Sequence, residues 1–397
     1  MFADVKPLPP DPILGLSKLF VDDPRERKID LGVGVFRAAD NTTPVLKAVK
    51  IAEQRLLERQ ATKAYAPPAG VPGFVEGAAR LVFGEDSPVL RDGRSAGVQT
   101  PGGCGALRVG AEILRRLEAG TVYVGAPTWP NHAPLLTEAG LKLEMIPYYD
   151  AQARAIEFDG FIAAVEKLGP GDVLLVHGAC HNPTGADLDR AQIDAIIETA
   201  DRRGFLPFVD LAYHGFAAGL DDDAYIVREM ARRLPELLVS YSCSKNFGLY
   251  RERTGALLIV GETGERAGAI QSHALNVARG MYSMPPAHGG SIVAEILQSP
   301  ELEAKWRDEL AHMRDTVKAN RRLLARTAAE MQLGDALAYI EGQNGMFSLL
   351  PLSEKQVLAM REKHGVYMTG NARINLCGVN AGNVAHLCEA YRDVTQG

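Results

Sequence analysis

The sequence predicts an α/β fold, because short apolar segments alternate with helical patterns along most of the chain. Five β-rich segments are expected to be strands: Thr121–Val124, Val173–Val176, Phe205–Val209, Leu237–Val239 and Ala256–Val260. Helical patterns such as the one at 189–203 separate these segments. This alternation is typical of a mostly parallel sheet that helices cover on both faces.

The chain length of 397 residues favours two domains over one compact core. We expect residues 44–310 to form a large domain around the sheet. Residues 1–43 are rich in Pro, Asp and Gly, and are expected to form an arm, loops and one short strand, Ile29–Phe36. This segment and residues 311–397 are expected to build a second, smaller α/β domain.

Two helices are expected in the second half of the chain. A long helix is predicted from about Pro300 to Met331, because apolar residues recur every three or four positions: Leu302, Trp306, Leu310, Met313 and Val317. Ser353 and Gln356 have the spacing of a capping box, which predicts that another helix begins there.

Composition excludes several classes of function. Lys and Arg total 43 against 49 Asp and Glu, a net charge of −6, so a basic surface for nucleic acid is not expected. No segment has the apolar length of a membrane span, and the Met1–Asp4 start lacks a signal-peptide pattern. The five cysteines are odd in number and scattered, which favours a reduced, cytoplasmic protein.

Polar residues follow three successive predicted strands. His177–Gly185 follows the strand at 173–176, Asp210–Tyr213 follows the next one, and Ser240–Gly248 follows the third, with Arg253 a little further on. Ligands of open α/β sheets bind beyond the carboxyl ends of the strands. The sequence therefore predicts a functional site at this edge of the sheet.

A glycine-rich turn, Pro101–Arg108, opens a helical pattern. Free backbone N–H groups at a helix start can bind a phosphate, although an ordinary tight turn has the same appearance. The turn is not a dinucleotide fingerprint, because Arg108 stands where the third glycine is required. Gly32-Val33-Gly34 likewise meets Arg37 there, and the sequence contains no P-loop pattern.

The sequence Ser242-Cys243-Ser244-Lys245 also matches the Ser-x-x-Lys pattern of another enzyme class, the penicillin-binding enzymes. That pattern needs Ser-Asp-Asn and Lys-Thr-Gly partners, and the nearest tripeptide here is Arg253-Thr254-Gly255. The penicillin-binding reading is therefore disfavoured.

His177, Cys180 and His181 are residue types that can bind a metal ion. The sequence offers no paired Cys-x-x-Cys and no carboxylate at ligand spacing, so hydrogen bonding and packing are the favoured roles. We expect no metal.

Taken together, the motifs resemble the class I aminotransferases of pyridoxal-5'-phosphate (PLP) fold type I, particularly the bacterial aspartate and aromatic-amino-acid aminotransferases. The resemblance covers essentially the whole chain. It rests on seven segments in order: Asp11–Leu16, Ile29–Val35, Pro127–His132, His181–Gly185, Ser244–Tyr250, Tyr282–Gly289 and Asn344–Ser348. It implies a large domain with a mostly parallel sheet and a smaller C-terminal α/β domain.

The resemblance implies a role for each residue around the cofactor ring. Lys245 would bind PLP covalently and then move the proton between substrate and cofactor. Asp210 would keep the pyridine nitrogen protonated, so that the ring accepts electrons. Tyr213 and Asn182 would hydrogen-bond the phenolic oxygen, and Trp129 would stack on the ring face. His132 and His177 would surround Asp210.

The resemblance also assigns the phosphate and substrate contacts. The phosphate would be held by Gly102, Gly103, Cys104, Ser242, Ser244 and Arg253, and by Tyr65 of the neighbouring subunit. The substrate would be held by Gly34, Trp129, Asn182, Phe347 and Arg373, with Arg279 of the neighbour meeting a distal carboxylate.

The implied reaction is a ping-pong transfer of amino groups from amino acids to 2-oxoglutarate or another 2-oxo acid, in a homodimer with shared active sites. Five positions differ from the aspartate-selective pattern: Phe36, Ala64, Cys104, His214 and Met284. Three of them, Ala64, Cys104 and Met284, are less polar than their counterparts, which favours aromatic amino acids as substrates. Arg279 favours the dicarboxylic substrates aspartate and glutamate as well. The alternatives are a strictly aspartate-selective aminotransferase, a decarboxylase or C–S lyase of the same fold, and a PLP-binding protein without turnover.

Overall fold

The computed structural model describes residues 2, 4–7 and 12–396. Of the residues used above, Met1, Ala3 and Asp11 lie outside this part. The chain divides into two compact units. Unit 1 comprises Met1–Thr42, Pro183–Gly185 and Thr316–Gly397, and unit 2 comprises Thr43–Asn182 and Ala186–Asp315.

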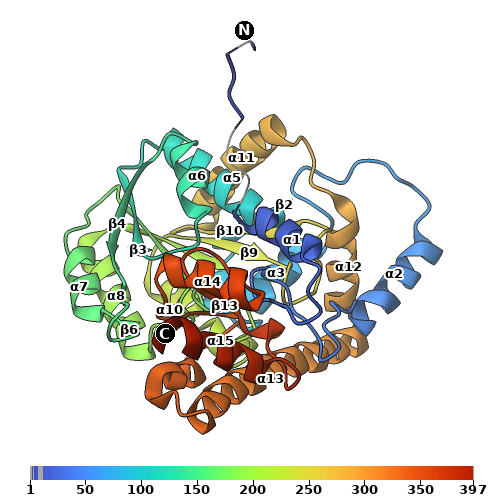
Figure 1. Ribbon diagram of the computed structural model, residues 1–397. Helices are drawn as coiled ribbons and strands as arrows, with labels where there is room; N and C mark the ends of the chain where they lie inside the picture. The colour runs from blue at the N-terminus through green and yellow to red at the C-terminus, as the bar shows by residue number, and fades with distance from the viewer. Residues whose placement is uncertain (1, 3, 8–11, 397) are drawn as a thin grey trace. The chain divides into compact units, whose positions relative to one another are not determined.

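Unit 2 is built on a seven-stranded sheet with the order β2-β10-β9-β8-β7-β3-β4 (Figure 1). Strand β10 runs antiparallel to both neighbours, while β9, β8, β7, β3 and β4 are parallel to one another. The prediction of a mostly parallel α/β sheet is therefore confirmed. The strands are β2 (Ser95–Pro101), β3 (Thr121–Ala126), β4 (Lys142–Pro147), β7 (Val173–His177), β8 (Leu206–Leu211), β9 (Leu237–Ser242) and β10 (Thr254–Val260).

Helices cover both faces of this sheet. On one face, α5 (Gly102–Arg116) crosses the strands so closely that a Cβ atom at Gly110 would lie 2.6 Å from the Phe208 ring. Helices α6 (His132–Thr137) and α11 (Gly264–Met281) join α5 in one buried apolar cluster with the strands. On the other face, α3 (Phe74–Phe83) brings Val75 against Gly97.

The remaining elements of unit 2 are short helices and one hairpin. They are α2 (Lys47–Arg59), α4 (Pro88–Arg91), α7 (Phe158–Val165), α8 (Arg190–Arg203), α9 (Leu220–Asp223), α10 (Tyr225–Arg233), α12 (Ala287–Gln298), β5 (Tyr149–Asp150) and β6 (Ala155–Ile156). The long predicted helix is α13, Pro300–Glu330, and its first half belongs to this unit.

Within its described residues, unit 1 contains two small sheets and three helices besides the second half of α13. Strand β1 (Ile29–Asp30) pairs in parallel with β12 (Val366–Tyr367), and β11 (Phe347–Leu349) pairs antiparallel with β13 (Arg373–Asn375). The helices are α1 (Pro12–Asp22), α14 (Glu354–His364) and α15 (Val384–Gln396), with 3-10 turns at Gly334–Gly342 and Leu376–Gly378. The capping box at Ser353 begins α14, as predicted.

The N-terminal segment differs from the expectation in two details. The strand predicted over Ile29–Phe36 ends at Asp30, because the Asp30 carboxylate accepts the N–H of Gly32 (2.9 Å) and turns the backbone. The expected arm contains helix α1, whose Leu16 is buried. A Cβ atom at Gly32 would lie 2.4 Å from Leu16, so glycine is what admits this helix side chain.

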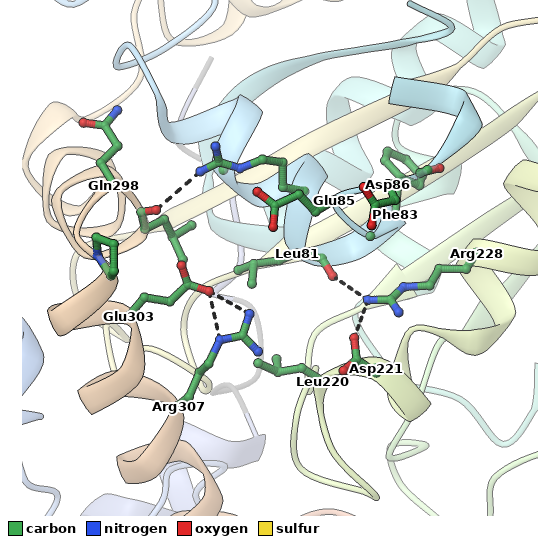
Figure 2. A pocket seen from close by; sticks show the side chains of 16 residues that line it. Leu81, Phe83, Glu85, Asp86, Leu220, Asp221, Arg228, Gln298, Glu303 and Arg307 are labelled. Carbon is green, nitrogen blue, oxygen red and sulfur yellow. Dashed lines mark hydrogen bonds and ion pairs between the residues drawn. The ribbon is translucent and has the colours of Figure 1, made fainter. Parts of the chain in front are cut away.

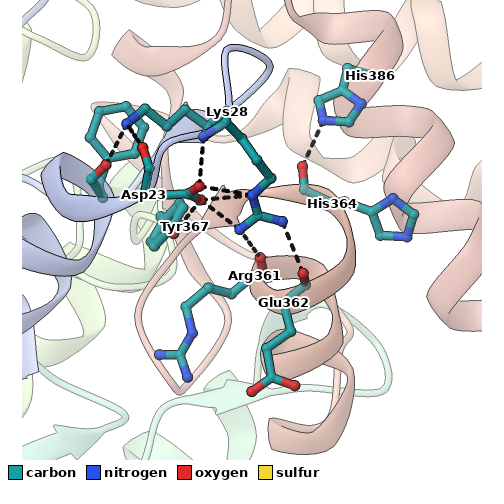
Figure 3. A network of polar contacts seen from close by, with 9 residues as sticks. Asp23, Lys28, Arg361, Glu362, His364, Tyr367 and His386 are labelled. Carbon is teal, nitrogen blue, oxygen red and sulfur yellow. Dashed lines mark hydrogen bonds and ion pairs between the residues drawn. The ribbon is translucent and has the colours of Figure 1, made fainter.

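A polar network ties the end of α1 to the end of α14 within unit 1 (Figure 3). Arg25 pairs with Asp23 and donates to the carbonyl oxygens of Arg361 (3.0 Å) and Glu362 (2.9 Å). The Tyr367 hydroxyl donates to Asp23 (2.6 Å). Hydrogen bonds from Arg25 and Tyr367 hold the pKa of Asp23 below its usual value. These contacts join segments from the two ends of the chain.

Within the described part of the chain, none of the helices is long and apolar enough to cross a membrane.

Candidate active site

The register of the sheet aligns the polar strand ends that the sequence singled out. Asp210 on β8 lies opposite His177 on β7 and opposite Ser240 on β9. Lys245 lies in the turn that follows β9, and its Nζ atom is 4.5 Å from the centroid of the Tyr213 ring. The structure therefore brings the predicted lysine, aspartate and tyrosine to one edge of the sheet in unit 2.

A chain of hydrogen bonds leads from the Asn182 backbone to the Asp210 carboxylate. The Asn182 N–H donates to His177 Nδ1 (3.1 Å), so the proton of a neutral His177 lies on Nε2, which contacts Thr128 Oγ1 (3.1 Å). Thr128 Oγ1 then donates to His132 Nδ1 (2.8 Å), and His132 Nε2–H donates to Asp210 Oδ2 (3.1 Å). One backbone group thus sets the direction of the whole chain.

The electrostatics keep Asp210 ionised and His177 neutral. Burial alone would raise the pKa of Asp210, but the hydrogen bond from His132 and the nearby His132, His177 and Lys245 lower it overall. Burial lowers the pKa of His177 to about 3, reinforced by His132 and opposed by Asp210. Burial also lowers the pKa of His181. A buried carboxylate that stays charged can pair with a protonated ring nitrogen.

The predicted phosphate residues also gather at one place. Gly102 has φ +71°, and a Cβ atom there would lie 2.7 Å from Arg253 Nη2. A Cβ atom at Gly103 would lie 3.2 Å from the Ser242 Cβ atom. Ser244 is buried beside Ser242, whose Oγ accepts its N–H at 3.3 Å. The first residues of α5, which are glycines, therefore face serine side chains and the Arg253 guanidinium. Backbone N–H groups, hydroxyls and a guanidinium are the groups that bind phosphate.

The turn that carries Asn182 depends on a residue that the sequence did not single out. Both carboxylate oxygens of Asp187 accept backbone N–H groups, from Cys180 (2.9 Å) and His181 (2.8 Å). Cys180 has φ +57°, a backbone conformation that costs free energy for a non-glycine residue. Asp187 therefore stabilises the strained approach to Asn182. The strand-end rule led to this turn but not to the carboxylate that holds it.

The aromatic residue Trp129 packs edge-on against His132, with ring centroids 5.4 Å apart. Thr128, its neighbour, joins His132 to His177 and was also not assigned a role from the sequence. It could have been found, because it lies two residues beyond the end of β3. Cys104 is half-buried, with Sγ 3.9 Å from Asn131 Nδ2.

Three predicted substrate residues lie together in unit 1. The Arg373 guanidinium lies over the Phe347 ring, 4.1 Å from its centroid, and donates to the Gly32 carbonyl oxygen (2.9 Å). A Cβ atom at Gly34 would lie 3.0 Å from the tip of the Phe347 ring. Arg373 is only 4% exposed, and a buried planar fork of this kind suits a carboxylate.

Tyr65 and Arg279 are the two residues predicted to act at the site of a neighbouring subunit. Tyr65 is 89% exposed. Arg279 lies near the end of α11, and its Nη1 atom donates to Ser283 Oγ at 2.6 Å. Their predicted roles at a neighbour's site stay predictions.

A separate hollow of about 700 Å³ in unit 2 is lined by none of the predicted site residues. Figure 2 shows ion pairs among its charged side chains: Arg228 pairs with Asp221 at 2.8 Å, and Arg307 pairs with Glu303 at 2.7 Å. Size alone therefore does not make this hollow a stronger candidate than the strand ends.

Comparison with known proteins decides the family. Residues 26–390 match the family model described as aminotransferase class I and II. The chain belongs to this aminotransferase family. Its relatives include the aromatic-amino-acid aminotransferase of Pseudomonas aeruginosa, 41% identical over 99% of this chain and 98% of the relative. The aspartate aminotransferase of Escherichia coli is 43% identical over 98% of this chain and 99% of the relative.

Solved aminotransferase structures share the fold. One is the aromatic-amino-acid aminotransferase from Burkholderia pseudomallei covalently bound to pyridoxal phosphate. Its TM-score is 0.96, with 39% identity and coverage of 99% of both chains. The donor set of this aminotransferase chain fits such a cofactor, because it offers an amine, a buried carboxylate and a glycine-lined phosphate cradle.

Proposed function

We propose that this chain is a PLP-dependent aminotransferase that accepts aromatic amino acids and the dicarboxylic pair aspartate and glutamate, with 2-oxoglutarate or another 2-oxo acid as acceptor. The observation that carries the proposal is the ionised Asp210 at the end of a directed hydrogen-bond chain, next to Lys245 and Tyr213. A charged carboxylate in this position could pair with the protonated pyridine nitrogen of a bound cofactor.

The cofactor, when bound, supplies an electron sink that stabilises negative charge on the substrate carbon. Lys245 would hold the cofactor and would then carry the proton between the substrate carbon and the cofactor carbon. Asp210 would keep the proton on the ring nitrogen. Tyr213 and Asn182 would stabilise the ionised phenolic oxygen, and Trp129 would cover the ring face and exclude water.

The phosphate is held by Gly102, Gly103, Cys104, Ser242, Ser244 and Arg253. The glycines matter because a side chain at Gly102 would collide with the Arg253 guanidinium. Arg253 matches the charge of a phosphate dianion with a permanently charged fork.

The substrate carboxylate is bound by Arg373, helped by Gly34, Asn182 and Phe347. The enzyme is a homodimer in which Tyr65 and Arg279 complete the neighbour's site, Tyr65 at the phosphate and Arg279 at a distal carboxylate. The 89% exposure of Tyr65 in the single chain supports this assignment. The reaction is ping-pong, since one site serves the amino donor and the acceptor in turn.

Aromatic substrates are supported by Ala64, Cys104 and Met284. A polar group facing an aromatic ring would lose its hydrogen bond to water, at a cost of about 1–3 kcal/mol. A methionine avoids that cost and adapts its shape. The names of the Pseudomonas aeruginosa and Burkholderia pseudomallei relatives point the same way, while the Escherichia coli relative supports the alternative of strict aspartate selectivity.

The domain division proposed here is a PLP-binding domain of residues 44–310 and a small domain of residues 311–397 with part of 1–43. The cytoplasm is the proposed location, supported by the five cysteines, which form no disulfide within the described residues.

The deciding experiment is a panel of amino donors with 2-oxoglutarate. We expect similar kcat/KM values for phenylalanine, tyrosine and aspartate. A kcat/KM for aspartate that is about three orders of magnitude higher, roughly 4 kcal/mol in transition-state binding, would contradict the proposal that aromatic amino acids are substrates. Conversion of bound PLP to its amine form by an amino donor alone separates transamination from the lyase and non-turnover alternatives.

A further inference from the structure

Helix α13 carries a buried arginine that the sequence did not assign to the site. Arg321 is 1% exposed. Its Nε and Nη2 atoms donate to the Gly345 carbonyl oxygen at 3.0 and 2.7 Å. Its other donors reach the carbonyl oxygens of Ile340 (3.0 Å), Asn344 (2.8 Å) and Phe347 (2.6 Å) and the hydroxyl of Ser348 (2.8 Å).

These acceptors all belong to one short segment, residues 340–348. The segment runs from the end of a 3-10 turn to the start of β11, where the regular ladder begins only at Phe347. Its carbonyl oxygens would otherwise be buried without regular partners, which is costly. The planar fork of an arginine presents several donors in fixed directions, and so it can hold several carbonyl groups in one arrangement.

The held segment includes a predicted substrate residue, Phe347. The Phe347 carbonyl oxygen accepts from Arg321, while the Phe347 ring lies 4.1 Å beneath the Arg373 guanidinium. The ring also fills the space left open at Gly34, where a Cβ atom would lie 3.0 Å away. A shift of the Phe347 backbone would therefore move the surface on which Arg373 rests.

The same arginine borders the turn that follows Asn182. Gly185 has φ +71°, and its carbonyl oxygen accepts the Asn344 N–H at 2.8 Å. A Cβ atom at Gly185 would lie 2.4 Å from the Phe347 carbonyl oxygen and 3.1 Å from Arg321 Nη2. The backbone of the turn, the 340–348 segment and the guanidinium thus pack without room for a side chain.

We infer that Arg321 is a positioning residue for substrate-carboxylate binding: its fork holds residues 344–348, which fix Phe347 and through it the guanidinium of Arg373. The inference rests on the proposed function, since it takes Arg373 to be the carboxylate ligand. Arg321 does not touch the substrate in this scheme. A purely structural arginine would instead change stability and leave carboxylate affinity in the folded enzyme unaltered.

The test measures binding of 3-phenylpropionate, which has a carboxylate and a ring but no amino group, to the PLP-loaded enzyme by calorimetry. Arg321→Gln and Arg321→Lys are compared with Arg322→Gln, a change at the exposed neighbour on the same helix. We expect both Arg321 variants to bind the probe about tenfold more weakly while keeping PLP, because small displacements of binding groups are expensive. Arg322→Gln should match the unaltered enzyme.

Arg321→Lys keeps the charge but not the fork. Unaltered affinity in that variant would overturn the inference, because the lysine cannot donate in the same set of directions. Arg373→Gln separates the two levels of the argument. Normal probe binding there removes the carboxylate assignment and the inference with it, whereas weak binding there beside normal binding in Arg321→Gln removes the inference alone.

If the Arg321 variants do not fold, Ser348→Ala decides. Ser348 Oγ accepts from Arg321 and donates to Gln343 Oε1 at 2.6 Å, so the change loosens the same segment more gently. We expect probe affinity to fall roughly two- to threefold, because the segment loses the two hydrogen bonds of Ser348 but keeps the carbonyl contacts with Arg321. Unchanged affinity in folded Ser348→Ala would contradict the inference.

Discussion

The amine nitrogen of Lys245 lies 4.5 Å from the centroid of the Tyr213 ring. The two side chains come from turns after neighbouring parallel strands and face the same space. We therefore expect borohydride reduction of the PLP-loaded protein, followed by peptide mapping, to find the pyridoxyl group on Lys245. The Lys245→Ala variant should still bind PLP but lose nearly all turnover. The control variant Lys167→Ala, at an exposed lysine, should keep normal turnover. A label on Lys50, Lys142 or Lys167 contradicts the assignment.

Arg253 should contribute more to phosphate binding than Cys104. A thiol is a poor hydrogen-bond donor, so Cys104→Thr should tighten PLP binding by about 1 kcal/mol or less. Arg253→Ala should weaken binding far more, because it leaves phosphate charge uncompensated. Equilibrium dissociation of PLP from each variant measures the ranking, with Arg251→Ala as the control at an exposed neighbouring arginine. Effects of equal size at the two positions would refute it.

Shared sites predict complementation between two inactive subunits. Lys245→Ala homodimers and Arg279→Ala homodimers should both be poor with aspartate. After the two are denatured and refolded together, about half of the dimers are mixed and each mixed dimer regains one complete site, so about a quarter of the sites should be active. The readout is aspartate turnover against mixing ratio. Absence of any recovery, with each protein refolding normally alone, argues against sharing.

The neutral His177 should make the folded protein sensitive to acid. Its pKa is lowered to about 3 in the folded state, against 6.5 for the free side chain. The unfolded chain therefore binds the extra proton first, and the stabilising contribution is complete above about pH 6.5 and is lost as pH falls toward 3. Over that window His177 adds a slope of up to about 1.4 kcal/mol per pH unit to the unfolding free energy.

His177→Gln should flatten this dependence, whatever it does to absolute stability. Urea unfolding at several pH values between 7.5 and 4.5 measures the slope. His273→Gln serves as the matched control, because His273 is an exposed histidine of unit 2. An unchanged slope in His177→Gln shows that the residue is not held neutral.

The sequence identified the site residues whose positions follow from strand order. It did not identify the residues and elements whose positions follow from tertiary packing. Asp210, Tyr213 and Lys245 were found because apolar runs mark the strands and polar chemistry follows their ends. Strand β2 was missed, since Ser95–Pro101 contains no apolar run, although its central residues are buried. Arg321 was missed for a related reason. A charged residue on a long helix is typical of a solvent-facing surface, and only the carbonyl groups of a distant segment make its burial possible.

The one antiparallel strand of the sheet, β10, has a further consequence. Because β10 runs back beside β9, the chain returns from Lys245 to Arg253 through turns within residues 243–253 rather than through a crossover helix. The proposed covalent and ionic contacts of the cofactor, Lys245 and Arg253, therefore lie in one connection between neighbouring strands. The proposed assignment requires this connection to match the span between the cofactor's reactive carbon and its phosphate. A single-residue insertion between Lys245 and Arg253 would therefore change the distance between these two proposed contacts, although both side chains would still be present.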